Sequence, residues 1–230
     1  WPESIVTGGT LRAGSGVHTA LVWLERLLYR RAAKIVVVTK GWENHFESLG
    51  IDIGKVTVIS NGADLADYDV PDSKDALRQR YGISGFTAVF TGNHSPYVGL
   101  ELILDAAAAL PDVNFVCVGN GSRKAWAISE SANRGLTNVE FRDPIGKPEL
   151  PWLLKACDVG LHTISPQSVF DKGMSPNKLF DYMASGIPIV SNARIPLRDV
   201  VKDDQAGPVV EPDELAQGIA RVRDADPQTR

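Results

Sequence analysis

The 230-residue sequence has little cysteine, no excess of charge of one sign and no long apolar run. Its two cysteines, Cys117 and Cys157, are too few and too far apart for a zinc site or a disulfide framework. Each lies in or beside an apolar run, where a reduced, buried thiol is expected. A formal net charge of -4 provides no basic field and argues against nucleic acid as a partner. No stretch approaches the roughly 20 apolar residues that a membrane-spanning helix needs.

What is present is typical of a globular chain, with 43% hydrophobic and 23% charged residues. The length suffices for one large domain or two modest ones. The sequence opens at Trp1 without an initiator methionine and stops just after a predicted helix, so we expect it to be part of a longer protein. Reduced cysteines, and the lack of a signal-peptide pattern at its start, favour a cytoplasmic location.

Predicted strands and helices alternate along most of the chain, separated by short connections. Strands are predicted at residues 35–39, 55–59, 87–91, 114–118, 138–141, 159–163, 187–191 and 208–210. Helices are predicted at residues 17–33, 41–49, 74–81, 99–110, 123–133, 147–156, 175–185, 196–201 and 213–223. This order predicts an α/β fold in which a doubly wound parallel sheet carries helices on both faces. The carboxyl ends of its strands, where such folds bind ligands, would share one edge.

An acidic stretch interrupts the alternation. Residues 63–75 contain five aspartates and Pro71, and we predict a domain boundary there. Residues 1–66 would be the remainder of a first domain, and residues 67–230 a second domain that lacks its final helix.

The most informative pattern starts at a serine–proline step. Ser175 is predicted to cap a helix and Pro176 to be its first residue, while Gly186 ends it. The free backbone N–H groups at its start, its dipole and Lys178 would form a seat for an anion. Asp181 lies one turn further on the same face, so a nucleotide could place its phosphate at the cap and its ribose on the carboxylate. An ordinary capped core helix with a Lys–Asp surface pair fits the pattern equally well.

Further loops at predicted strand ends point to the same edge. Gly92 and Gly119 open two strand-to-helix loops in which glycine lets backbone amides approach a phosphate, and a third loop begins at Asp143. A need for positive φ explains such glycines equally well, and no dinucleotide or Walker fingerprint occurs. His94 and His162 follow strands and have either a functional or a structural role. The sequence has no metal-ligand spacing and no nucleophile elbow.

Residues 175–188 closely resemble the donor-binding motif of retaining GT-B glycosyltransferases of family 4, nearest to the branch that builds bacterial surface polysaccharides. They read Ser-Pro-Asn-Lys-Leu-Phe-Asp-Tyr-Met-Ala-Ser-Gly-Ile-Pro. Residues 1–4, 61–64, 118–121 and 156–159 are similar to further landmarks of that family. The resemblance covers nearly the whole chain. It implies two Rossmann-like domains facing across a cleft, with only the tail of the first one present.

The resemblance also implies a set of site residues. Asp181 takes the role of the acid that holds the ribose hydroxyls. Apart from the resemblance, we expect Lys178 to be a catalytic cation and Glu3, from the opposite domain, to border the acceptor. The residues expected to bind the nucleotide-sugar are Gly92, Asn93, His94, Ser95, Gly119, Asn120, Gly121, Arg123, Asp143, Pro144, Ile145, Ser175, Pro176, Asn177, Lys178 and Asp181.

The chain departs from the family pattern at several positions. The family's first acid falls at Gly173, so either Asp171 replaces it as a catalytic residue or the sugar is bound without it. The usual Arg and Lys of the first loop are Asn93 and Val98, which leaves the diphosphate charge to Lys178, with Arg123 or Lys124 as further candidates. The usual Glu is an aspartate, at position 181.

The resemblance implies transfer of a sugar, of the hexosyl or N-acetylhexosaminyl type and with retention, from a nucleotide-sugar to a carbohydrate or polyprenyl-phosphate-linked acceptor. UDP is the expected nucleotide, and no cofactor or metal is expected. A sugar-nucleotide epimerase of the same architecture is one alternative, and a non-catalytic nucleotide-sugar-binding module or inactive fragment is another. The three arginines of the helix at residues 17–31 either rest on the inner face of the plasma membrane or form a solvated face.

Overall fold

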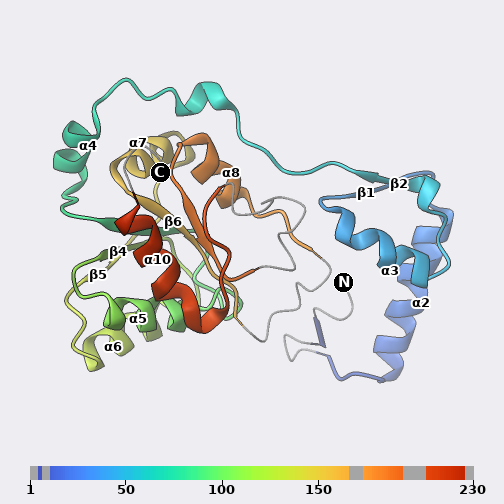
Figure 1. The fold of residues 1–230 in the computed structure, drawn as a ribbon. Helices are drawn as coiled ribbons and strands as arrows, with labels where there is room; N and C mark the ends of the chain where they lie inside the picture. The colour runs from blue at the N-terminus through green and yellow to red at the C-terminus, as the bar shows by residue number, and fades with distance from the viewer. Residues whose placement is uncertain (1–4, 7–10, 166–172, 194–205, 226–230) are drawn as a thin grey trace. The chain divides into compact units, whose positions relative to one another are not determined.

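A computed structural model describes residues 5–6, 11–165, 173–193 and 206–225. These residues form two compact units, which are described separately (Figure 1). The first contains the described residues up to Ser60, together with residues 173–175. The second contains the remaining described residues from Asn61 onward.

The first unit is a two-stranded parallel sheet, covered by helices. Its elements are α2 (Gly16–Arg31), β1 (Ile35–Val37), η1 (Lys40–Trp42), α3 (Glu43–Ser48), η2 (Ile53–Lys55) and β2 (Val56–Val58). Helix α2 begins after Ser15, whose side chain accepts a hydrogen bond from the His18 N–H, as expected of an N-cap. Ile35, Phe46 and Ile51 form its small core.

The second unit contains a five-stranded sheet in which every neighbouring pair is parallel. Its strands are β3 (Thr87–Thr91), β4 (Asn114–Val118), β5 (Val139–Arg142), β6 (Val159–His162) and β7 (Ile189–Ser191). Its helices are η3 (Leu65–Tyr68), α4 (Lys74–Tyr81), α5 (Leu100–Ala109), α6 (Lys124–Asn133), η4 (Lys147–Glu149), α7 (Leu150–Ala156), α8 (Asn177–Ala184), η5 (Pro212–Glu214) and α10 (Leu215–Asp224). The strand order is β5-β4-β3-β6-β7. The predicted doubly wound parallel sheet is therefore confirmed.

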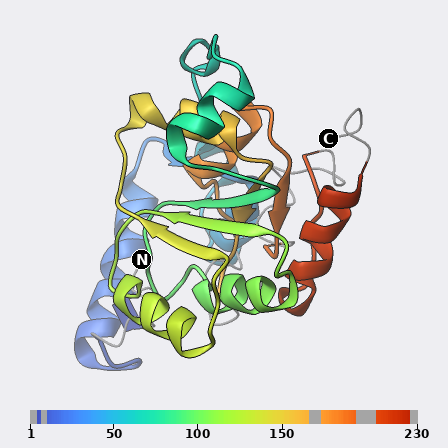
Figure 2. The same ribbon diagram turned by 90° about the vertical axis from the view of Figure 1, so that its left-hand side faces the viewer.

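Helices cover both faces of this sheet. α5, α6 and α10 lie on one face, and α4, α7 and α8 lie on the other (Figure 2). The core on the first face includes Phe90, Ile103 and Phe115, none of which is more than 1% exposed. Both faces of β3 are buried, which explains why its residues alternate so little in polarity.

One predicted strand is shorter in the structure, and one predicted helix is not tested by it. The strand expected at residues 208–210 is reduced to an isolated parallel bridge between Ser191 and Val209. The Ser191 N–H donates to the Pro208 carbonyl and the Val210 N–H donates to the Ser191 carbonyl, but prolines at positions 208 and 212 have no N–H to extend the ladder. The helix expected at residues 196–201 lies outside the described residues.

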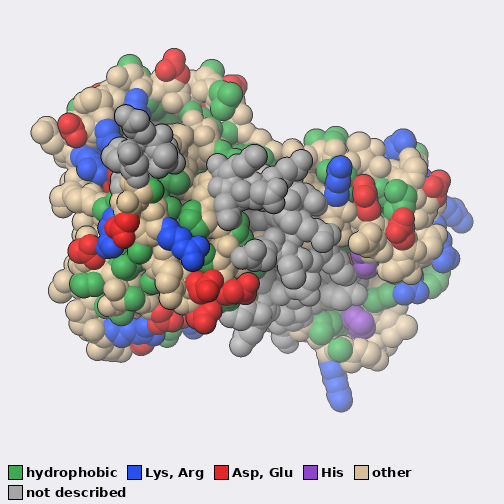
Figure 3. Space-filling view, viewed as in Figure 1, with side chains coloured by type: hydrophobic (Ala, Val, Ile, Leu, Met, Phe, Trp, Pro, Cys, Tyr) green, Lys and Arg blue, Asp and Glu red, His purple; other side chains and the backbone are tan. Residues whose placement is uncertain are grey.

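Acidic and basic side chains are both present on the face shown in Figure 3, in keeping with the modest net charge. Among the described residues, no helix is both long and apolar enough to cross a membrane.

Candidate functional site

A cavity of about 520 Å³ lies at the carboxyl end of the sheet, within the second unit. It lies where the strand order reverses, since β3 pairs with β4 on one side and with β6 on the other. Its lining residues come from the ends of β3 and β4, the loop after β5, the starts of η4 and α7, and the first two turns of α8. They are Thr91, Gly92, Asn93, Val118, Gly119, Asn120, Pro144, Ile145, Lys147, Leu150, Asn177, Lys178 and Asp181. The structure thus brings nine of the predicted residues together around one cavity.

The two glycine loops of the cavity support each other through their backbones. The Gly92 N–H donates to the Val118 carbonyl at 2.9 Å, and the His94 N–H donates to the Asn120 carbonyl at 2.8 Å. A Cβ at Gly119 would lie 1.9 Å from the Gly92 carbonyl oxygen, and φ there is +147°. Glycine is therefore required because one loop crosses directly against the other, a reason that the sequence did not reveal.

Helix α8 begins one residue later than the predicted cap at Ser175 and first helical residue Pro176 imply. Pro176, with an extended backbone (φ -71°, ψ 132°), is the N-cap, and Asn177 is the first helical residue. Ser175 is therefore not the cap, and no side chain caps this helix. Proline at the N-cap costs the helix no hydrogen bond, because an N–H at that position would have no partner within the helix. The Leu179 N–H donates to the Pro176 carbonyl. Among the described residues, the N–H groups of Asn177 and Lys178 have no acceptor, so they could donate hydrogen bonds to an anion.

Lys178 carries an ammonium group that has no counterion among the described residues. Its Nζ lies 3.8 Å from the centroid of the Phe90 ring. A Cβ added at Gly92 would lie 3.3 Å from the same Nζ, so the backbone also packs closely against the ammonium. No ion pair to Lys178 occurs in the described parts of the chain. Burial lowers the pKa of Lys178 from 10.5 to about 7. A cation held in this way is stabilised by an arriving anion.

Asp181 lies deeper in the same cavity, with its side chain only 7% exposed. It accepts a hydrogen bond from the Tyr68 hydroxyl at 2.6 Å and forms an ion pair with Lys147. The Lys147 ammonium also lies 3.2 Å from the Tyr68 hydroxyl. Burial and the bond to Asp181 raise the pKa of Tyr68 to about 12. Desolvation opposes the charge on Lys147, but its bonds to Asp181 and Tyr68 raise its pKa overall.

Tyr182 is inserted where β3 and β6 diverge. Its hydroxyl accepts a hydrogen bond from the Thr91 N–H at 3.0 Å and lies 3.4 Å from the Leu161 carbonyl. The ring is fully buried, and a Cβ at Gly160 would lie 2.4 Å from it. Tyr182 thereby attaches α8 to the strand whose end forms part of the cavity.

Several predicted residues lie beside the cavity and do not line it. Asp143 is exposed and paired with Lys124 at 2.8 Å, which lowers the pKa of Asp143. The Arg123 guanidinium lies 3.6 Å from the Trp126 ring centroid. The remaining predicted residues absent from the lining are His94, Ser95, Gly121, Ser175 and Pro176.

The two histidines at strand ends are buried. His162 Nδ1 lies 2.9 Å from the Ser191 hydroxyl, and burial lowers the pKa of His162 to about 3. Burial lowers the pKa of His94 to about 4, and neither ring nitrogen of His94 has a hydrogen-bond partner in the described structure. Both imidazoles are therefore neutral at physiological pH.

Asp171 and Glu3 lie outside the described residues. In the portion that the structure describes, no group of three His, Cys, Asp or Glu side chains could hold a metal ion. The expectation that the site needs no metal stays a prediction.

Sequence reasoning did not find Thr91, Val118, Lys147 or Leu150 as lining residues, or Tyr68 as a partner of Asp181. Lys147 follows the loop of the predicted strand at residues 138–141, so its place at the sheet edge offered a signal. Tyr68 is 113 residues from Asp181 in the chain, and no local pattern connects them.

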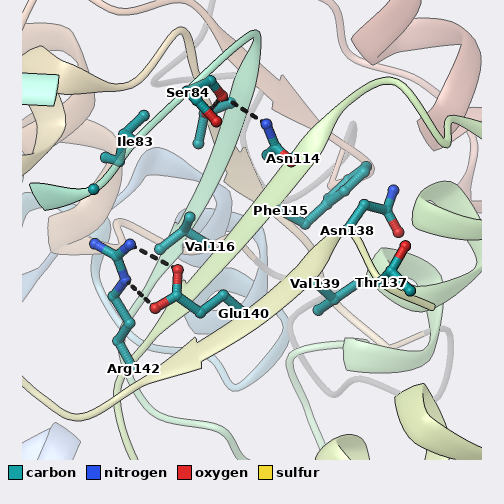
Figure 4. A pocket seen from close by; sticks show the side chains of 12 residues that line it. Ile83, Ser84, Asn114, Phe115, Val116, Thr137, Asn138, Val139, Glu140 and Arg142 are labelled. Carbon is teal, nitrogen blue, oxygen red and sulfur yellow. Dashed lines mark hydrogen bonds and ion pairs between the residues drawn. The ribbon is translucent and has the colours of Figure 1, made fainter. Parts of the chain in front are cut away.

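A second, smaller cavity of about 150 Å³ lies towards the amino ends of β3, β4 and β5. Figure 4 shows Glu140 and Arg142 paired along its wall and Asn114 donating to the Ser84 carbonyl. Because Glu140 and Arg142 satisfy each other, and ligands bind such sheets at the opposite edge, this cavity has no evident catalytic character.

Comparisons with known proteins find glycosyltransferases among the relatives of this chain. The chain is 28% identical over 217 residues to a D-inositol 3-phosphate glycosyltransferase of Mycolicibacterium gilvum, covering 89% of this chain and 48% of that protein. It is 29% identical over 140 residues to TuaH of Bacillus subtilis, a glycosyltransferase named for teichuronic acid biosynthesis, covering 59% of this chain and 34% of TuaH. The chain thus spans half or less of the length of these relatives.

Among solved structures, the chain resembles Anabaena HepE in complex with UDP and glucose, with a TM-score of 0.76 and 25% identity. That alignment covers 92% of this chain and 58% of HepE and confirms the predicted GT-B fold class. The family described as glycosyl transferase 4-like domain matches residues 4–62, and the one described as glycosyl transferases group 1 matches residues 85–224. Because the latter match covers more than half of its residues, the chain belongs to the glycosyl transferases group 1 family.

Proposed function

We propose that this chain supplies the donor-binding part of a glycosyltransferase that moves a sugar from a UDP-sugar to a carbohydrate or lipid-linked acceptor, with retention. The observation that carries the proposal is the start of α8. Within the described part of the chain, two helical amides and the Lys178 ammonium have no partner. They line one cavity at the strand switch point together with the Asp181 carboxylate, one turn further along α8. Free amides and a cation suit a diphosphate, and a carboxylate one turn away suits the hydroxyls of a ribose.

The chemistry follows from the charges. Breaking the bond between sugar and diphosphate leaves negative charge on the departing UDP, while the anomeric carbon becomes cationic. The N-terminal dipole of α8 and Lys178 would stabilise that negative charge in place of a metal ion. We propose Asp171 as the second acidic residue of the site, with a catalytic role. If the departing phosphate takes the proton of the acceptor hydroxyl, no separate general base is needed.

The relatives support the donor class and the biological setting. HepE was solved with UDP and glucose, and TuaH is named for teichuronic acid biosynthesis. We therefore propose surface polysaccharide synthesis as the setting, with a hexosyl or N-acetylhexosaminyl donor.

The acceptor side is proposed to lie near Glu3, at the cytoplasmic face of the plasma membrane. Helix α2 has exposed arginines and exposed apolar side chains, including Trp23 (64% exposed) and Leu28 (55% exposed). This composition suits peripheral contact with an anionic membrane surface.

The test compares binding with turnover. UDP-sugar binding by calorimetry and UDP release are measured for this chain and for one extended to the full length of its relatives. We expect both to bind UDP and the extended one to release UDP only when an acceptor is present. Binding without turnover in the extended chain would support the non-catalytic alternative, and conversion of the sugar without an acceptor would support the epimerase.

A matched pair of variants tests the assigned site. Lys178→Met should weaken UDP binding by about tenfold or more, since a charge-assisted contact to phosphate is lost. Arg30→Met in α2 should leave UDP binding unchanged. Equal effects of the two substitutions would contradict the assignment.

A further inference from the structure

The carboxylate of Asp181 is held by two side chains that belong to other elements. Tyr68 comes from η3, close to the start of the second unit, and Lys147 comes from η4, after β5. Both bind the same oxygen, Oδ1, and Lys147 also contacts the Tyr68 hydroxyl. The Tyr68 hydroxyl, the Lys147 ammonium and Oδ1 of Asp181 therefore all contact one another.

The other oxygen, Oδ2, has no hydrogen bond from the described residues. A carboxylate that is only 7% exposed normally has both of its oxygens satisfied. Since Asp181 lines the cavity, the unused oxygen is the one available to a ligand there.

Asp158 provides an internal comparison. Its side chain is 9% exposed, almost as buried as that of Asp181, but it lies away from the cavity. Its Oδ1 binds Lys74 at 2.7 Å, while its Oδ2 binds Arg78 at 2.6 Å and the Thr87 N–H at 2.8 Å. A purely structural buried carboxylate in this unit thus uses both oxygens, whereas Asp181 uses one.

The protonation states favour a hydroxyl ligand. Tyr68 and Lys147 keep their protons at neutral pH, so both act as donors to Asp181. An ionised carboxylate only accepts hydrogen bonds, so Oδ2 pairs with a donor such as a ribose hydroxyl. A hydrogen in place of that hydroxyl would leave a buried acceptor unpaired.

We propose that Tyr68 and Lys147 are positioning residues that fix Asp181 for the ribose of the donor, and that they set the preference for a ribonucleotide over a deoxyribonucleotide. This inference rests on the proposed function, because it requires a nucleotide in the cavity. Tyr68 and Lys147 act through Asp181, each by holding Oδ1 and so orienting Oδ2.

The experiment uses this chain and measures binding of UDP, 2′-deoxy-UDP and 3′-deoxy-UDP by calorimetry. The readout is the ratio of affinities, which general loss of structure would not selectively change. We expect the parent chain to prefer UDP over at least one deoxy analogue by about tenfold or more. Tyr68→Phe and Lys147→Gln should each reduce that ratio towards one, and Lys147→Arg should restore most of it.

Two control variants remove comparable contacts elsewhere. Tyr29→Phe deletes a phenol that donates to the buried Glu25 at 3.0 Å in the first unit. Lys74→Gln deletes a half-exposed lysine paired with the buried Asp158. Both controls should keep the parent ratio.

The outcomes separate the two proposals. If the parent chain binds UDP but shows no ribose preference, or if Tyr68→Phe and Lys147→Gln both keep the parent ratio, the positioning role is wrong and the donor site remains. If the parent chain does not bind UDP, or if Lys178→Met binds it equally well, the proposed function itself fails. A melting temperature for each variant identifies any that does not fold, and the other substitution then decides.

Discussion

Lys178 shows how a buried charge can be unfavourable for the stability of the free protein and still favour the binding of an anion. Its ammonium is desolvated and rests against Phe90 without a counterion among the described side chains. Burial of this kind disfavours the charged form, which is why the pKa of Lys178 falls to about 7. A diphosphate supplies the missing negative charge, so binding and protonation of Lys178 are linked.

The first prediction concerns pH. Because the diphosphate favours the ammonium form, affinity should be full below the pKa of free Lys178 and should fall as pH rises through about 7. With UDP-glucose, whose diphosphate diester does not titrate in this range, the affinity should fall about tenfold between about pH 6 and pH 8. Calorimetry at each pH measures the change.

Lys178→Arg is the control for this pH dependence, because arginine keeps its charge throughout the range. Its affinity for UDP-glucose should stay level. A parent chain whose affinity does not change between these pH values would show that Lys178 is not the titrating contact.

The second prediction concerns Tyr182. Tyr182→Phe leaves the buried Thr91 N–H without its partner and should lower the free energy of unfolding by about 1–3 kcal/mol. Tyr81→Phe removes a partly buried phenol that bonds Glu149 at 3.2 Å and should cost less than about 1 kcal/mol. Urea unfolding of both variants provides the comparison, and equal losses would contradict the role of Tyr182.

At the scale of elements, the two glycine loops act as one unit. The loop after β3 and the loop after β4 exchange backbone hydrogen bonds, and the glycines at 119 and 121 permit the close approach. The cavity wall formed by Gly92 and Asn120 thus depends on the contact between these loops, beyond the conformation of either loop alone.

The third prediction follows from that contact. Gly119→Ala would place a methyl group 1.9 Å from the Gly92 carbonyl oxygen and should lower the free energy of unfolding by about 3 kcal/mol. It should also abolish UDP binding by displacing the wall. Gly135→Ala is the matched control, since φ there is also positive (+66°) but nothing lies within 4 Å, and it should cost only about 1 kcal/mol. Thermal unfolding followed by UDP titration distinguishes them; similar behaviour of the two variants would rule out the interlocked-loop explanation.

For the molecule as a whole, the candidate donor site belongs to one unit. Every residue that lines the larger cavity lies in the second unit, and so do Tyr68 and Tyr182. That unit also has its own continuous core, formed by β3, β4 and β6 with α5 and α10. Donor binding should therefore not require the first unit.

The fourth prediction tests this division. A fragment comprising residues 61–230 should bind UDP with an affinity within about threefold of that of the 230-residue chain, because the lining residues are the same. Calorimetry on both proteins measures it, with Lys178→Met in the fragment as the negative control. If the fragment folds but loses UDP, residues of the first unit must contribute to the site.

The positions of the main strands and helices could be predicted from the sequence because local physics determines them. Apolar β-branched runs produced β3 and β4 with the predicted bounds, and helical periodicity produced α4 with its predicted bounds. The prediction of a strand at residues 208–210 was wrong, because extending the ladder requires backbone N–H donors that Pro208 and Pro212 lack. The predicted start of α8 was wrong by one residue because either Ser175 or Pro176 could act as the cap.

The sequence by itself determined the parallel sheet and the family. It also placed Lys178 and Asp181 on one face of a helix, since spacing along one segment is enough for that. Only the tertiary structure decided which groups face the cavity together. It turned Arg123 towards Trp126 and paired Lys124 with Asp143. It also brought Tyr68 and Lys147 to Asp181 from distant segments. Contacts between residues far apart in the chain depend on how the elements pack, and no local pattern encodes them.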